Sequence, residues 1–84
     1  MATKSVSIQD FFFDPEDTRI SKGDTVQWTN EGSSRHTVTA PGLFDKVLEP
    51  GEAFTHEFPE AGTVNYHCRF HSVSHQMKGT VTVS

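Results

Sequence analysis

A short run near the end of the chain, at residues 65–81, contains the only cysteine and three of the five histidines. Cys68, His71 and Met77 in this run, with His36 upstream, supply one thiolate, two imidazoles and one thioether. Two imidazoles and a thiolate in a trigonal set, with a weak thioether on the axis, form a copper site that transfers electrons. The run therefore predicts a mononuclear copper site.

The donor types explain why such a site would suit electron transfer. Thiolate and thioether stabilise Cu(I), whereas imidazole binds both Cu(I) and Cu(II), so little rearrangement is needed when an electron arrives. Four protein donors leave no open position for a substrate. The sequence also has no carboxylate dyad, Ser–His pair or Gly-rich phosphate loop, so we expect no enzyme.

Two other kinds of metal protein remain possible. A copper carrier or chaperone usually offers Met-rich or Cys-x-x-Cys sites, and a single cysteine disfavours that interpretation. One cysteine and two histidines with a loose fourth ligand could instead hold a structural zinc ion. His75 lies in the same run and is expected to be an exposed loop residue, with axial ligation in place of Met77 as the alternative.

The length and the charge narrow the classes of partner. The 84 residues predict one domain, 1–84, and a single cysteine excludes an internal disulfide. The net charge of −4 disfavours nucleic acid as a partner. No apolar stretch reaches the roughly 18 residues that a membrane span needs, and the N-terminus MATKSVSI has no apolar segment typical of a signal peptide.

The segments that must position the donors are predicted to be short strands separated by turns. Apolar and polar residues alternate at 6–8, 25–30, 53–58 and 79–84. Seven or eight strands at this spacing predict an all-β fold, a Greek-key antiparallel β-sandwich. Only the segment around 43–49 could be helical.

Some local details can also be predicted. One extra residue near Asp10 predicts a bulge or bend, with Phe11 and Phe13 pointing inward and Phe12 outward. Tyr66 and Cys68 should point inward. His67 between them should face solvent.

At the level of motifs the chain resembles the cupredoxins. YHCRFH…MKGTVTV is similar to their closing signature, Y-x-C-x2-H…M-x-G-x-V-x-V, and VSIQDFFFDPEDTRISKGDTVQWTN is similar to their opening strands. The resemblance covers nearly the whole chain and is nearest to small plastocyanin-like and amicyanin-like members. It implies a blue copper electron-transfer protein with one type 1 copper ion per chain. The implied ligands are His36, Cys68, His71 and Met77. The spacing H-x5-M departs from the family's H-x2-M and H-x4-M.

The resemblance also has implications for oligomeric state, location and partners. It predicts a monomer outside the cytoplasm, for example in the periplasm, that docks transiently with redox proteins near His71. Phe70 and Val73, with Leu43 and Pro41, are the apolar residues expected around the exposed edge of the His71 ring.

Overall fold

The computed structural model describes residues 2–70 and 77–84 of the chain. Nine strands cover most of these residues. They are β1 (Thr3–Gln9), β2 (Phe12–Asp14), β3 (Asp17–Ile20), β4 (Thr25–Asn30), β5 (His36–Ala40), β6 (Phe44–Leu48), β7 (Ala53–Glu57), β8 (Gly62–His67) and β9 (Lys78–Val83). Within the described ranges no helix is long and apolar enough to cross a membrane.

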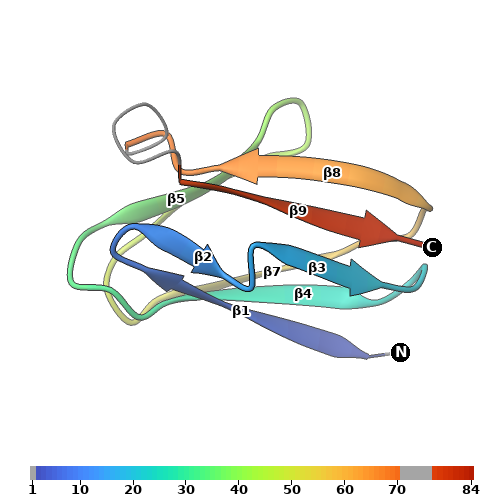
Figure 1. The fold of residues 1–84 in the computed structure, drawn as a ribbon, viewed down its shortest axis with the longest axis horizontal. Coiled ribbons are helices and arrows are strands. Elements are labelled where there is room, and N and C mark those ends of the chain that lie inside the picture. The colour runs from blue at the N-terminus through green and yellow to red at the C-terminus, as the bar shows by residue number, and fades with distance from the viewer. Residues whose placement is uncertain (1, 71–76) are drawn as a thin grey trace.

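The strands form two sheets that pack face to face (Figure 1). The first sheet has the order β2-β1-β4-β7, and the second has the order β3-β9-β8-β5-β6. The predicted all-β sandwich is thereby confirmed. Its sheets are mixed, however, since β1 pairs with β4 and β3 pairs with β9 in parallel. Alternation along one strand carries no information about the direction of its neighbour, which is why these parallel pairs could not be predicted.

The predicted bend near Asp10 is a tight turn. Gln9 pairs with Phe12 across the β1–β2 hairpin, so Asp10 and Phe11 form the connection. Phe13 is buried and Phe12 is 52% exposed, as predicted. The inward prediction for Phe11 is wrong, since its side chain is 36% exposed. A turn residue does not continue the alternation of the strand before it.

The segment with possible helical character is strand β6. Its five residues pair with β5 from Phe44 opposite Ala40 to Leu48 opposite His36. The backbone groups of this short segment are satisfied by the neighbouring strand, and this pairing decides its conformation.

An aromatic cluster fills the space between the sheets. Trp28 is fully buried, stacks on Phe54 at 5.7 Å between ring centroids, and meets Tyr66 edge-on at 5.3 Å. His56 lies at the rim of this cluster, 4.8 Å from the rings of both Phe44 and Phe58. Partial burial there lowers the pKa of His56. The strands next to the predicted donors thus pack on an aromatic core.

Candidate metal centre

His36 is the first residue of β5 and is completely buried. Its two ring nitrogens have different neighbours. Nδ1 lies 3.8 Å from Cys68 Sγ, and Nε2 lies 2.6 Å from Asp10 Oδ1. The imidazole therefore presents Nδ1 to the cysteine sulfur.

Cys68 follows the last residue of β8 and is also completely buried. The backbone N–H of Thr37 points at Sγ, with a nitrogen–sulfur distance of 3.4 Å. The hydroxyl of the same threonine accepts a 2.7 Å hydrogen bond from the backbone N–H of Arg69. Thr37, near the start of β5, thus contacts both Cys68 and the residue that follows it, and these contacts join β5 to the end of β8.

The separation of the two donor atoms fits a bridging metal ion. Bonds of about 2.0 Å to imidazole and 2.3 Å to thiolate, the lengths found for zinc, span roughly 3.7 Å when they meet at about 120°. The observed distance between Nδ1 and Sγ is 3.8 Å. The two donor atoms are therefore spaced as ligands of one metal ion would be.

Met77 lies beside Cys68. The backbone N–H of Cys68 donates a 3.0 Å hydrogen bond to the Met77 carbonyl oxygen, and the Met77 side chain is buried. The structure therefore brings the donor atoms of His36 and Cys68 together and places the backbone of Met77 beside Cys68. His71, like His75, lies outside the described residues. Within 2–70 and 77–84, no three His, Cys, Asp or Glu side chains converge on one point.

Asp10 contacts the predicted site although the sequence analysis did not include it among the candidate ligands or their partners. Its Oδ2 accepts hydrogen bonds from the Ser33 backbone N–H at 3.0 Å and from the Ser33 hydroxyl at 2.7 Å. Its Oδ1 accepts a longer bond from the Ser34 backbone N–H at 3.3 Å and faces His36. The two bonds from Ser33, and then the one from His36, hold the pKa of the carboxyl well below its usual range.

The loop that binds Asp10 is itself shaped by a buried amide. Asn30 ends β4, and its Nδ2 donates to the carbonyl oxygens of Ser34 and Leu48, both at 2.9 Å. Its Oδ1 accepts from the Gly32 backbone N–H at 3.0 Å. All of its near partners are backbone groups, so this side chain fixes the path of residues 31–34.

The surface beside Cys68 carries an aromatic ring that contacts two cations. Phe70 is 44% exposed, and the guanidinium carbons of Arg35 and Arg69 lie 5.8 and 5.7 Å from its ring centroid. Both arginines also face carboxylates, Arg69 facing Asp45 at 2.9 Å and Arg35 facing Glu49 at 3.8 Å. The positive charge of the two arginines is thus largely balanced by these carboxylates.

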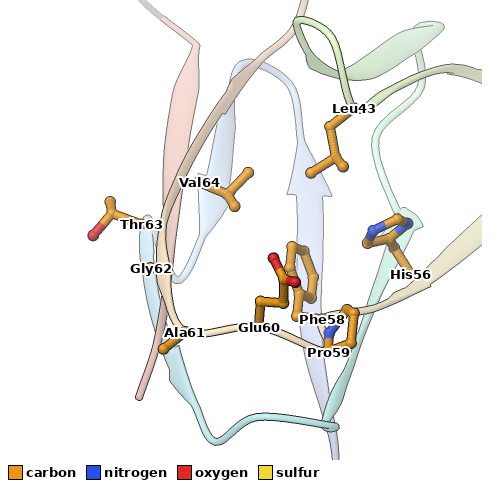
Figure 2. Close-up of a pocket in the computed structure, with 9 residues that line it drawn as sticks. All are labelled: Leu43, His56, Phe58, Pro59, Glu60, Ala61, Gly62, Thr63 and Val64. Atoms are coloured by element: carbon orange, nitrogen blue, oxygen red, sulfur yellow. The ribbon is translucent and has the colours of Figure 1, made fainter.

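Other surface predictions have mixed outcomes. Leu43 was expected beside the edge of the His71 ring, which lies outside the described residues, and its side chain lines a pocket at the start of β8 (Figure 2). Its neighbours there come from His56 and from residues 58–64, the connection into β8. The hydrogen bond from the Leu43 backbone N–H to the Ala40 carbonyl turns the chain toward that side. His67 is half-buried rather than fully outward, while Tyr66 and Cys68 are buried as predicted.

Comparison with known proteins bears on this arrangement. Residues 1–83 match the family model of the cupredoxin-like domain. A plastocyanin from Scenedesmus fuscus is 32% identical over 84% of this chain and 85% of its own length. An amicyanin from Paracoccus denitrificans is 29% identical over 93% of this chain, which spans 63% of that protein.

Solved structures agree with these relatives. A purple cupredoxin from Nitrosopumilus maritimus superposes with a TM-score of 0.88 at 31% identity, covering 96% of this chain and 99% of that one. A reduced amicyanin variant gives a TM-score of 0.87 at 30% identity, covering 98% and 82%.

Proposed function

Because this chain belongs to the cupredoxin family, we propose that it is a small electron carrier with one type 1 copper ion. The proposed ligands are a thiolate, two imidazoles and an axial thioether, namely Cys68, His36, His71 and Met77. The copper ion supplies a one-electron couple between Cu(II) and Cu(I). The protein is a carrier and no enzyme, in keeping with its plastocyanin and amicyanin homologues.

The observation that carries the proposal is the pairing of His36 Nδ1 with Cys68 Sγ at 3.8 Å, with both side chains completely buried. Burial excludes water, so the donors do not need to exchange solvent when the charge changes. Strand pairing holds His36, and the amide of Thr37 holds the sulfur. Donors fixed in this way keep one geometry in both oxidation states, which suits rapid electron transfer.

The amide at the sulfur also affects the reduction potential. A hydrogen bond from Thr37 draws electron density from the thiolate. It therefore weakens the donation that stabilises Cu(II), and the potential rises. Hydrogen bonding and hydrophobicity around the cysteine sulfur are known controls of the potential in such sites.

The test is the visible spectrum of the apo-protein after addition of Cu(II). An intense sulfur-to-copper charge-transfer band is expected, and Cys68→Ser should abolish it. His67→Ala is the matched control, because this neighbouring imidazole is not among the proposed ligands and the band should persist. A coloured Cys68→Ser protein would overturn the assignment. A colourless complex with Cu(II) beside tight binding of Zn(II) would favour the structural zinc site, and rapid loss of copper to a chelator would favour a carrier.

The proposal includes the partners and the cellular location. Family likeness supports a monomer outside the cytoplasm that docks briefly with redox proteins near His71. Sedimentation of the copper-loaded protein tests the monomer. Fractionation of cells of the source organism tests the location.

A further inference from the structure

We infer that Asp10 is a positioning residue that prepares His36 as a metal donor, and that its negative charge lowers the reduction potential of the site. This inference rests on the proposed function and deepens it. The distance that carries it is 2.6 Å, between Asp10 Oδ1 and His36 Nε2.

The chemistry of the two groups assigns the proton between them. An ionised carboxylate only accepts hydrogen bonds, so Nε2 of His36 must carry the hydrogen. In the neutral imidazole this leaves the lone pair on Nδ1, the nitrogen that faces Cys68 Sγ. Because both ring nitrogens are engaged, the ring has one orientation.

The carboxylate is itself held in place by a dedicated loop. Ser33 donates two hydrogen bonds to Oδ2, and Ser34 donates one to Oδ1. Gly32 leaves room for the carboxylate, since a Cβ atom at that position would lie 2.3 Å from Oδ1. Asn30 fixes the loop through Gly32 and Ser34. A hydrogen-bonded chain therefore runs from the core strand β4 to the imidazole.

The charge of Asp10 has its own consequence. A carboxylate behind a ligating imidazole makes the imidazole a better donor. A better donor favours the more highly charged Cu(II) over Cu(I), so the potential falls. The side chain of Asp10 is 24% exposed and that of His36 is completely buried, so solvent screens this interaction only partly.

The experiment compares Asp10→Ala and Asp10→Asn with Ser33→Ala. Ser33→Ala removes one hydrogen bond to the carboxylate but keeps both the charge and the contact with His36. Affinity for Zn(II), which has no redox chemistry, is measured by competition with a chelator. The midpoint potential of the copper-loaded protein is measured by titration. Thermal unfolding of each apo-protein separates metal binding from folding.

Asp10→Ala should weaken Zn(II) binding by about 10- to 100-fold, the usual cost of losing a partner of a metal ligand. Asp10→Asn should raise the potential, by about 59 mV for each tenfold loss of Cu(II) affinity relative to Cu(I) affinity. Ser33→Ala should change both quantities much less. Asp10→Asn gives the decisive reading if Asp10→Ala does not fold.

Unchanged Zn(II) affinity and midpoint potential in Asp10→Asn would overturn the inference. Asp10 would then only link the β1–β2 turn to the loop at 31–34. The outcome is separable from the proposed function. Loss of the visible band in the wild-type protein would refute type 1 copper, whereas the Zn(II) arm would still show whether Asp10 supports metal binding by His36.

Discussion

The ring of Tyr66 occupies the space that a side chain at position 79 would need. A Cβ atom built at position 79 would lie 2.4 Å from both Cζ and Oη of Tyr66. Real Cβ atoms do not approach other atoms so closely, and Tyr66 is buried with its ring packed edge-on against Trp28 and Phe13. The glycine of the closing motif is therefore required by packing against the aromatic core.

Gly79→Ala should accordingly lower the free energy of unfolding by about 1–3 kcal/mol, the usual cost of overpacking a core. The measurement is chemical denaturation of the apo-protein, which removes any contribution of bound metal. Lys78→Ala is the control, because Lys78 is the exposed neighbour on the same strand. Equal stability of Gly79→Ala and the wild type would mean that Tyr66 can move aside.

Tyr66 should also limit stability at alkaline pH. Burial raises the pKa of its phenol to about 12 from the ordinary 10.0, although the nearby indole of Trp28 partly offsets this. Between these values the folded protein keeps a proton that the unfolded chain releases, so stability is full below pH 10 and falls as pH rises toward 12. The shift of about 2 pKa units corresponds to a loss of roughly 2–3 kcal/mol.

Tyr66→Phe separates this effect from other alkaline titrations. Among residues 2–70 and 77–84, the Tyr66 hydroxyl and Trp28 Nε1 have no partner with ordinary hydrogen-bond geometry, so removing the hydroxyl should cost little at pH 7. The free energy of unfolding of Tyr66→Phe, measured from pH 8 to 11.5, should fall less steeply than that of the wild type. Parallel curves would assign the alkaline loss to other groups.

Met77 should control the potential more than the colour. Leucine has nearly the same volume in the buried site and lacks the thioether. Met77→Leu should keep an intense visible band and raise the potential, since loss of a donor disfavours Cu(II) more than Cu(I). His75→Ala should leave both almost unchanged. If His75→Ala transforms the spectrum and Met77→Leu is silent, the longer loop supplies a histidine as the axial ligand.

The sequence predicts those features that depend on residue type and local period. Trp28 alternates with polar neighbours and is in the core. Cys68 and His36 are residue types whose capacity to bind copper is evident from the sequence. Asp10 could not be predicted in the same way. Its partner lies 26 residues further along the chain, and nothing near Asp10 indicates which distant loop the β1–β2 turn will meet.

The wrong prediction for Phe11 and the open assignment of segment 43–49 have the same origin. Phe11 belongs to an alternating apolar stretch, yet the hairpin turn places it outside, with its ring 6.1 Å from that of His36. The segment 43–49 has weak local preference, and its conformation is decided by pairing with β5. In each case a contact between distant segments outweighs the local pattern.

Copper should stabilise a protein that already folds without it. The aromatic cluster around Trp28 and Tyr66 does not depend on the donors, so the apo-protein should show a β-sheet circular dichroism spectrum. Free copper at a hundredfold excess over Kd adds about 2.7 kcal/mol if only the folded state binds. For a domain of this size the melting temperature should rise by roughly 10–20 °C. Cys68→Ser should lose most of this rise, and an unfolded apo-protein would show that the core is weaker than argued.

The last prediction concerns the surface through which the electron leaves. Phe70 lies two residues after Cys68, is 44% exposed, and has the guanidinium groups of Arg35 and Arg69 within 6 Å of its ring centroid. An exposed ring beside a ligand-bearing strand suits a brief encounter, which buries less than about 1,200 Å². Phe70→Ser should slow electron exchange with a redox partner by about tenfold, since about 1.4 kcal/mol of docking energy corresponds to that factor.

Leu43→Ser is the control for the proposed electron-exit surface around Phe70. Leu43 is 50% exposed and apolar but lines the pocket of Figure 2, so its loss should leave the exchange rate unchanged. Both variants should keep the visible spectrum. The rates are measured at high salt, where screening removes the long-range influence of charges such as Glu16. Val73→Asp, in the segment outside the described residues, should slow exchange as Phe70→Ser does. Equal rates for the wild type, Phe70→Ser and Val73→Asp would mean that the electron does not leave through the surface around Phe70. His67 would then be the next position to vary.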